Sequence, residues 1–314
     1  MDIKPLFSIT IPAFKDKYLK EAIDSVMAQT YQNYEVVIVN DASPYNIDSI
    51  VCQYTDPRIH YFKNIKNCGA KNVVDNWNIC LNHSTGEYII CMGDDDKLKP
   101  DCLQIYIDLM TKYPNLDIYH TRTEIIDENS NSVCILEERP DWESVYSLMY
   151  IHRSSFIGDW LFKTEVLRKN GGFYKFPYGW VSDYVTAFIA ATNHGVANSN
   201  EVGFQYRGNR LSISYDLSCI DGKIEAFRTY TKWRLDFVSD KHPDNEEDKH
   251  LIELIKQNSV SIANQGIEDM IEFDIRKNIG KRGIFWLIHR KKYEISFSQY
   301  ARCLMKSIKY RFIK

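Results

Sequence analysis

The stretch TGEYIICMGDDDKLKPD, residues 85–101, decides the fold class. It contains a short apolar run, Tyr88–Met92, that is followed after one glycine by the acidic triplet Asp94–Asp96. A short apolar run bounded by turn-forming residues is typical of a buried strand. Pro100 then favours the start of a helix that reaches about Lys112, because proline suits the first helical turn. This segment therefore predicts a strand, an acidic loop and a helix.

The same alternation of strands and helices extends over the first 120 residues. It predicts right-handed crossovers and a parallel sheet. The expected strands are Phe7–Ile11, Glu35–Val39, Ile59–Phe62, Tyr88–Met92 and Leu116–Thr121, with helices near residues 18–27, 46–54, 71–81 and 100–112. We expect an α/β, Rossmann-like fold with a mostly parallel sheet flanked by helices.

The pattern changes after residue 121. Two short runs, Thr123–Ile126 and Val133–Leu136, flank the polar segment DENSNS and predict a hairpin. Further helices are expected near residues 143–150, 164–169 and 182–193, and from about residue 218 the sequence reads as helical. We expect one domain over residues 1–217, with halves 1–121 and 122–217, and a helical C-terminal extension over residues 218–314.

The composition indicates a soluble globular protein. The net charge of -3 points to no polyanionic partner for the whole chain, and the eight cysteines form no Cys-x-x-Cys pair. Scattered cysteines in apolar stretches are typical of buried free thiols in a reducing compartment. No run reaches the roughly 18 to 20 apolar residues that span a bilayer. We expect a cytoplasmic protein, or one on the inner face of a membrane.

The acidic triplet Asp94–Asp96 is the strongest chemical signal. Adjacent carboxylates repel one another, and burial adds to the cost of ionising them. Mg²⁺ or Mn²⁺ relieves that repulsion, usually through one or two carboxylates together with substrate phosphates. The alternative is a solvated acidic turn that caps the next helix. Because ligands of parallel sheets bind at the carboxyl ends of the strands, the position favours a metal site.

Two further aspartates stand where chemistry is expected. Asp41 follows the strand Glu35–Val39 and can accept a hydrogen bond from a base or ribose, although its position alone favours a simple Asx turn. Asp183 opens an apolar helix, where an aspartate is ordinarily an N-cap. In a catalytic role it would be a general base that removes a proton from an acceptor hydroxyl.

Several enzyme classes lack support. The sequence contains no Gly-x-Ser-x-Gly elbow, no Walker loop and no His-Glu-x-x-His motif. A nucleotidyltransferase would need a Gly-rich phosphate loop near the first strand, and SITIPAFKDKY has none.

Six segments, taken in order, resemble the family 2 glycosyltransferases, which have the GT-A fold. They are SITIPAFK, YLKEAIDSVMAQTYQNYEVVIVNDAS, TGEYIICMGDDDKLKPD, WLFKTEVLRKNGGF, GWVSDYVTAFIAA and YRGNRLSIS. The third is similar to the segment that holds the family's metal-binding Asp-x-Asp, and the fifth to its Glu-Asp base motif. The match covers residues 7–214, about two thirds of the chain.

The resemblance implies a nucleotide-sugar site with one catalytic base. Asp183 is the implied base, and Asp95 is the implied ligand of Mn²⁺ or Mg²⁺. The implied donor-binding residues are Pro12, Ala13 and Phe14 along the nucleotide, Asp41 on the base, Lys71 facing the donor, Asp94 on the ribose, Asp96 on its loop or the donor sugar, and Arg207 near the phosphates.

The implied reaction is inverting transfer of a sugar, from a UDP- or dTDP-linked donor, to a hydroxyl in bacterial-type polysaccharide or glycolipid synthesis. The implied acceptor is a glycan or a lipid-linked glycan. Two residues depart from the family pattern: Gly93 stands where many members have the first aspartate, and Ser182 replaces the usual glutamate before the base. The alternative is a catalytically inactive protein that binds a nucleotide-sugar or a glycan.

The end of the chain is basic. Residues 281–314 contain ten lysines and arginines and one glutamate, a net charge of +9 in a chain of net charge -3, with aromatic and aliphatic residues between them. This pattern suits an anionic membrane surface. The alternative is a helical appendage with a solvated basic edge. No recognition motif for nucleic acid accompanies the charge.

Overall fold

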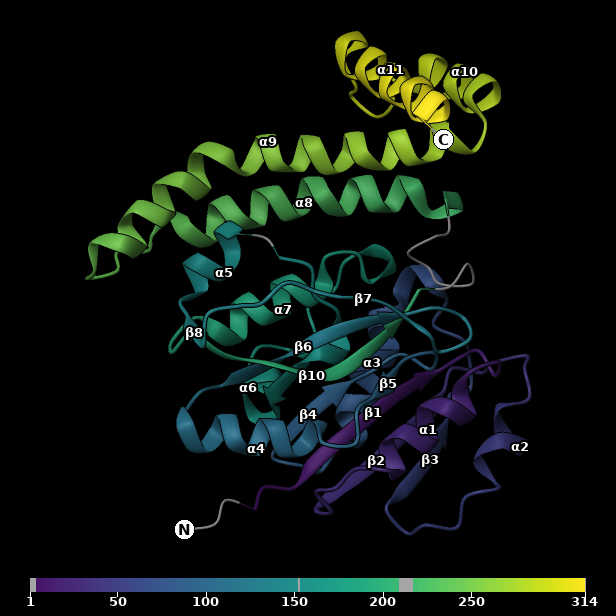
Figure 1. Ribbon diagram of the computed structural model, residues 1–314, viewed down its shortest axis with the longest axis vertical. Helices are drawn as coiled ribbons and strands as arrows, with labels where there is room; N and C mark the ends of the chain where they lie inside the picture. Colours follow the sequence, from purple (N-terminus) through teal and green to yellow (C-terminus); the bar gives the residue numbers. More distant parts are fainter. Residues whose placement is uncertain (1–3, 152, 209–216, 314) are drawn as a thin grey trace. The chain divides into compact units, whose positions relative to one another are not determined.

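The computed structural model describes residues 4–151, 153–208 and 217–313 (Figure 1). The chain forms two compact units, residues 1–212 and 213–314. The domain boundary expected at residue 217 stays a prediction, because the segment just before it, residues 209–216, lies outside the described residues.

A mixed sheet of ten strands forms the centre of the first unit, with strand order β3-β2-β1-β4-β9-β6-β10-β5, β7 beside β6 and β8 beside β10. The strands are β1 (Phe7–Ala13), β2 (Tyr34–Asn40), β3 (Ile59–Lys63), β4 (Tyr88–Cys91), β5 (Lys97–Leu98), β6 (Ile118–Ile126), β7 (Ser132–Ile135), β8 (Trp142–Glu143), β9 (Trp160–Lys163) and β10 (Val196–Arg207). The expected α/β class is confirmed.

Helices flank this sheet (Figure 1). They are α1 (Leu19–Met27), α2 (Ile47–Val51), α3 (Val73–His83), α4 (Cys102–Lys112), α5 (Val145–Ile151), α6 (Thr164–Lys169) and α7 (Ser182–Ala191), with short 3₁₀ turns η1 (Ala70–Asn72), η2 (Ile157–Asp159) and η3 (Pro177–Gly179).

The parallel half of the sheet creates the common edge on which the site depends. Strands β3, β2, β1 and β4 are parallel; Ala13 lies opposite Asn40, and Thr10 opposite Cys91. The carboxyl ends of β1, β2 and β4 are therefore in register, and the loops that follow them leave from one edge, as the sequence predicted.

The sheet becomes mixed beyond β4. Strand β9 runs antiparallel to both β4 and β6, whereas β10 runs parallel to β6. The parallel arrangement expected for most of the sheet thus applies to its first four strands and to the β6–β10 pair. The two runs expected at 116–121 and 123–126 form one strand, β6, and its hairpin with β7 is confirmed by the pairing of Glu124 with Ile135.

The core of this unit lies between the sheet and its helices. Every residue of β2 is buried, and Phe7, Ile9 and Ile11 of β1 are fully inaccessible to solvent. All eight cysteines are free; Cys52 and Cys134 are exposed, which the expectation of uniformly buried thiols did not include.

The second unit is helical, as expected. It contains η5 (Leu217–Cys219), α8 (Ile220–Ser239), α9 (Glu246–Lys277), α10 (Ile279–His289) and α11 (Phe297–Ile313). Its core includes Ile224, Ile271 and Trp286, and the Trp286 indole N–H donates to Asp274, which also pairs with Arg282 at 2.6 Å. Within the described ranges, no helix is both long enough and apolar enough to cross a membrane.

Candidate active site

Asp94 ties the acidic loop to the end of β1. Its Oδ2 accepts hydrogen bonds from the backbone N–H groups of Phe14 at 2.7 Å and Lys15 at 2.6 Å. The carboxyl group is buried; this burial, together with the charge of Asp95, raises the pKa of Asp94 to about 6. The loop after β4 and the loop after β1 are therefore joined by a buried carboxylate.

Asp96 ties the same loop to β10. Its Oδ1 accepts a hydrogen bond from the backbone N–H of Arg207 at 2.9 Å. Burial raises the pKa of Asp96 well above its ordinary value, and the charge of Asp95 adds to the effect. The resemblance implied that Asp96 supports its loop or contacts the donor sugar. The hydrogen bond to Arg207 supports the loop.

Arg207 is a buried anchor. Its guanidinium donates to the Asp95 carbonyl at 2.7 Å and to the Ser130 hydroxyl at 3.0 Å. It also pairs with Glu21 at 2.9 Å and lies over the Tyr18 ring, 4.2 Å from its centroid. These contacts connect α1, the acidic loop and the β6–β7 hairpin. A contact of Arg207 with donor phosphates stays a prediction.

Gly93 allows two carboxylates to converge. A Cβ placed on Gly93 would lie 2.9 Å from Asp95 Oδ1 and 2.8 Å from Asp96 Oδ2, closer than real side chains approach. The departure from the family pattern at this position therefore has a steric basis: in this loop the carboxylates occupy the space that a side chain would need.

The acidic loop can contribute one carboxylate, that of Asp95, to a cation site. In the described segments, no three His, Cys, Asp or Glu side chains are arranged to hold a metal by themselves. Asp94 and Asp96 already accept backbone N–H groups, and Asp95 is half-buried between them. Its charge raises the pKa of both neighbours, and a cation relieves such repulsion. One carboxylate with substrate phosphates is a common way of binding Mg²⁺.

Asp41 is held by the segment that follows β3. Its Oδ1 accepts hydrogen bonds from the Asn64 side-chain amide at 2.8 Å and the Cys68 backbone N–H at 2.9 Å. Its own backbone N–H donates to the Ala13 carbonyl at 2.9 Å. Asn64 and Cys68, which hold the carboxylate, are thus distant in sequence from Asp41, which the Asx-turn alternative did not predict.

The end of β1 lies beside Asp41. Pro12 pairs with Val39 and is half-buried, whereas Ala13 is buried. Phe14 is half-buried, and its ring meets the Tyr45 ring edge-on at 5.9 Å. The Phe14 carbonyl accepts a hydrogen bond from the Ser43 hydroxyl, which fixes the loop after β1 against the loop after β2.

Asp183 lies within the first turn of α7 rather than at its N-cap. The N-cap is Val181, in the left-handed conformation with φ 61°, and Tyr178 nearby has φ 63°. Positive φ is rare for non-glycine residues and is strained for a β-branched one. The Asp183 carboxylate accepts the Tyr184 backbone N–H at 2.9 Å.

The pKa of Asp183 is raised to about 7. Burial is the main cause, and the negative charge of Asp159 adds to it, whereas the hydrogen bond from the Tyr184 backbone N–H acts against it. Asp159 is fully buried at the end of η2, which contacts β4, the strand that leads into the acidic loop. A carboxylate with this pKa is poised to gain or lose a proton near neutral pH.

The segment before Asp183 packs on the segment that carries Lys71. Turn η3 contacts η1, on which Lys71 is exposed. Gly179 approaches so closely that an added Cβ would lie 3.1 Å from Val73 and 3.2 Å from Trp77. Since η1 begins two residues after Cys68, the contact joins the Asp183 segment to the surroundings of Asp41.

Residues 8–158 match the family model described as glycosyl transferase family 2. The chain carries a family 2 glycosyltransferase domain. It is similar to "Uncharacterized glycosyltransferase RT0329" of Rickettsia typhi, 31% identical over 185 residues, which are 57% of this chain and 57% of the relative. It is also similar to "Putative glycosyltransferase EpsE" of Bacillus subtilis, 29% identical over 129 residues, 41% of this chain and 46% of the relative. The chain thus spans about half the length of these curated relatives.

Two solved structures share the GT-A fold of this family 2 chain. Staphylococcus aureus TarS 1-349, in complex with UDP-GlcNAc, has a TM-score of 0.63 at 15% identity and covers 98% of this chain and 92% of its own. The mannosyltransferase PcManGT from Pyrobaculum calidifontis, in complex with GDP-Man and Mn²⁺, has a TM-score of 0.58 at 16% identity. The match covers 98% of this chain and 86% of the PcManGT chain.

Sequence reasoning missed several residues that build the candidate site. Asn64 and Cys68 hold Asp41, and Asp159 acts on Asp183, but none of them stands in a strong motif. One signal was available for Asp159: a Gly-Asp pair directly before an apolar run marks a turn that enters a strand.

Replacing Gly93 with alanine should displace the carboxylates of the acidic loop. Overpacking of this kind costs typically about 1–3 kcal/mol. We expect the Gly93→Ala variant to unfold at a lower temperature and to bind a nucleotide-sugar more weakly in Mn²⁺, by calorimetric titration. Gly280→Ala is the matched control, because an added Cβ there meets only the Asn278 side chain, at 3.9 Å. Donor binding by Gly93→Ala equal to that of the control would contradict the steric role of Gly93.

Proposed function

We propose that this protein is an inverting glycosyltransferase that moves a sugar from a nucleoside diphosphate to a hydroxyl group. One observation carries the proposal: the loops after β1, β2 and β4 share one edge of the sheet, and buried carboxylates join them. Asp94 binds the loop after β1, and Asp41 follows β2. Coenzyme and nucleotide ligands of α/β sheets bind at this kind of edge.

The donor in this proposal is a UDP- or dTDP-sugar. Asp41 would contact the base, Pro12 and Ala13 would line the nucleotide, and the Phe14 ring would cover it. Lys71, exposed on η1, would face the donor phosphates. TarS, which shares the fold, was crystallised with UDP-GlcNAc, which supports a uridine nucleotide.

The chemistry is a single displacement. An oxygen of the acceptor attacks the anomeric carbon, and a carbon–oxygen bond forms as the bond from that carbon to the diphosphate breaks. The Asp183 carboxylate takes the acceptor's proton, and the bonding electron pair leaves with the nucleoside diphosphate. General-base assistance is worth about 10²- to 10⁴-fold in rate.

Asp95 would hold the divalent cation, Mn²⁺ or Mg²⁺, together with the donor phosphates, and Asp94 would contact the ribose. Such a cation neutralises the charge that grows on the leaving diphosphate. The structure of PcManGT is a complex with GDP-Man and Mn²⁺, which supports metal use on this fold. Because two of the three loop carboxylates are committed to backbone N–H groups, we expect cation and donor to bind cooperatively.

The acceptor in this proposal is a glycan or a lipid-linked glycan of the bacterial cell envelope. The enzyme would act in the cytoplasm, at the inner face of the membrane, with its basic C-terminal segment facing anionic lipid. The net charge of +9 over residues 281–314 supports this location.

The second candidate is an inactive protein that binds a nucleotide-sugar or a glycan. Ser182 favours it, because this residue replaces the family's usual glutamate beside the base. In the structure the Ser182 hydroxyl accepts the Phe176 backbone N–H at 3.1 Å and is fully buried, so it braces the turn before α7.

Donor binding is the first prediction of the proposal. A ligand at 100 times its Kd stabilises a protein by about 2.7 kcal/mol. A thermal-shift screen of UDP-, dTDP- and GDP-sugars with Mn²⁺ should raise Tm for a UDP- or dTDP-sugar. Release of the free sugar from that donor without acceptor would separate an enzyme from an inactive binder. An unchanged Tm with every donor would contradict both readings.

The second prediction concerns Asp183. Asp183→Asn removes the proton acceptor, so kcat should fall by about 10²- to 10⁴-fold. Donor affinity should stay within twofold of wild type in calorimetric titration. Asp108→Asn, an exposed carboxamide substitution on α4, is the matched control. Turnover by Asp183→Asn equal to that of the control would exclude Asp183 as the base.

The same residue sets a pH dependence. A base must be ionised, and burial raises the pKa of Asp183 to about 7. Wild-type kcat/KM for the acceptor should therefore fall about tenfold for each pH unit below about pH 7 and level off above it. A flat profile between pH 5 and pH 8, measured at saturating donor, would count against this base.

The third prediction concerns Asp95. Asp95→Asn should lower donor affinity in Mn²⁺ to the level that wild type shows with a chelator, because the cation loses its protein ligand. Titrations with and without chelator measure this, and Asp108→Asn again serves as the control. A Mn²⁺ effect that survives in Asp95→Asn would assign the metal to other residues.

A further inference from the structure

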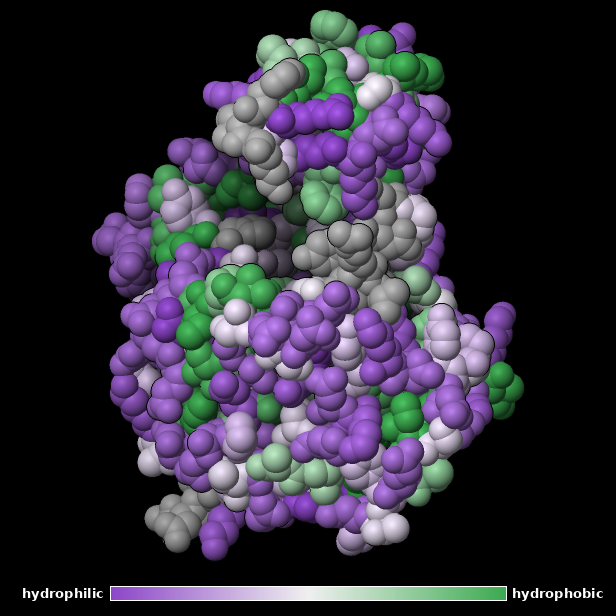
Figure 2. Space-filling model, turned by 45° about the vertical axis from the view of Figure 1, so that its right-hand side comes forward, coloured by the Kyte–Doolittle hydropathy of each residue, from purple (hydrophilic) through white to green (hydrophobic). Residues whose placement is uncertain are grey.

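The helical unit carries an apolar ridge that its own core leaves uncovered. The ridge is Ile284, Leu287 and Ile288 on α10, with side chains 60%, 41% and 68% exposed. Spacings of three and four residues place all three on one side of the helix. Trp286, on another side, is buried in the core. Figure 2 shows apolar patches among hydrophilic ones over α10 and α11, at the top of the view.

Cations frame the ridge. Lys281 lies three residues before its first member, on the same face of α10, and Lys291 is exposed in the turn that follows the helix. Lys309 and Arg311 on α11 are exposed as well. Among the described residues, no carboxylate forms an ion pair with any of these four side chains. Their charge is therefore available to an outside partner.

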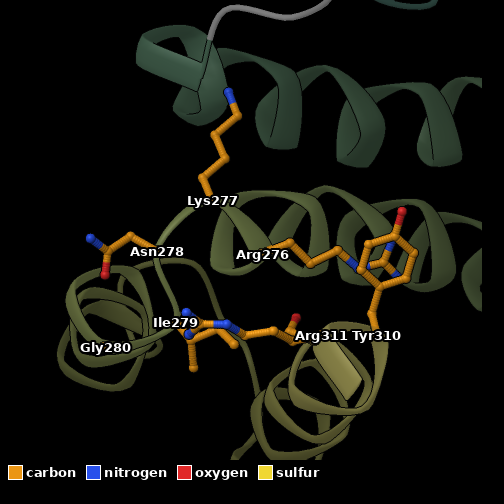
Figure 3. Close-up of a pocket in the computed structure, with 8 residues that line it drawn as sticks. Arg276, Lys277, Asn278, Ile279, Gly280, Tyr310 and Arg311 are labelled. Carbon is orange, nitrogen blue, oxygen red and sulfur yellow. The ribbon is translucent and has the colours of Figure 1, made fainter. Parts of the chain in front are cut away.

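A pocket adjoins the start of the ridge. It has a volume of about 420 Å³ and is lined by Arg276, Lys277, Asn278, Ile279, Gly280, Ser307, Tyr310 and Arg311. Figure 3 shows the Arg311 side chain extending from α11 toward Ile279, whereas Lys277 points away from the pocket. Gly280 lies one turn before Ile284 on the same face of α10. A guanidinium beside the first turn of a helix suits a phosphate group.

We propose that α10 and α11 dock the protein on an anionic lipid bilayer. The ridge enters the boundary between headgroups and acyl chains, and the four exposed cations contact lipid phosphates, one of which can occupy the pocket through Arg311. This inference deepens the membrane location in the proposed function by assigning it to particular side chains. An apolar face framed by lysines is the arrangement by which amphipathic helices lie in a bilayer surface.

Charge distinguishes the bilayer from a second copy of the chain. Lys281, Lys291, Lys309 and Arg311 are exposed and form no ion pair among the described residues, so two copies meeting through this surface would bring like charges together. Anionic headgroups instead supply the opposite charge across the whole face. An anionic bilayer can thus bind both groups: its acyl chains contact the exposed aliphatic side chains, and its headgroups contact the cations.

Vesicle flotation of the full-length protein tests the proposal. The probes are vesicles of phosphatidylcholine alone and vesicles in which part of it is replaced by phosphatidylglycerol. We expect binding to the second kind only, reduced about fivefold by each of Lys281→Ser and Lys291→Ser. Ile284→Ser with Ile288→Ser should reduce it at least tenfold, since most of the inserted apolar surface is lost. Val260→Ser, which removes a side chain 55% exposed on α9, should bind as wild type does.

Each outcome decides for or against the bilayer. Equal binding to both kinds of vesicle, or full binding by the Ile284→Ser, Ile288→Ser variant, would overturn the proposal. The wild-type protein could instead bind no vesicles and form a dimer in light scattering, with the Ile284→Ser, Ile288→Ser variant monomeric. That result would assign the ridge to a contact between copies of the chain. Thermal unfolding checks that the variants are folded. Flotation needs neither donor nor acceptor, so its result is independent of sugar transfer.

Discussion

The site depends on two hydrogen-bonded carboxylates that flank a third. Asp94 is held by the end of β1 and Asp96 by the backbone of Arg207, so three adjacent acidic side chains are kept in one short loop. Burial and the charge of Asp95 raise the pKa of both neighbours, and the backbone N–H groups offset part of this effect. A loop with this arrangement favours a bound cation. In the proposed function, the cation would supply positive charge to the loop, and the diphosphate would balance the rest of the cation's charge.

The alternating pattern of the sequence was sufficient for the parallel half of the fold. Runs such as Glu35–Val39 are short, β-branched and bounded by turns, and each became a strand. Periodicity did not reveal β10, because its register shifts between Ser199 and Val202 and again before Phe204, which breaks a clean alternation of faces. Strand β9 has only four residues and leads directly into α6, so its pattern is too short to separate from that of a helix.

The sequence predicted that the loops after β1, β2 and β4 lie at one edge of the sheet. It did not predict which residues the side chains of these loops contact. The bond between Asp94 and Phe14 joins residues 80 apart, and that between Asp96 and Arg207 joins residues 111 apart. No local pattern encodes such partners, because they exist only once the sheet has assembled. For the same reason the sequence did not predict that Arg207 is buried and links three elements, and the phosphate contact that the resemblance implied for it stays a prediction.

The environment of Asp183 shows how packing between distant segments fixes one side chain. The left-handed Val181, two residues before it, costs about 1–2 kcal/mol, and such a conformation persists only where packing enforces it. Turn η3, which precedes Val181, packs on α3: a Cβ added to Gly179 would lie 3.1 Å from Val73 and 3.2 Å from Trp77. The same helix follows the turn that carries Lys71. In the proposed function, a change in that turn would therefore alter both the contact with the donor and the burial of the base, and nucleotide binding would be coupled to proton removal.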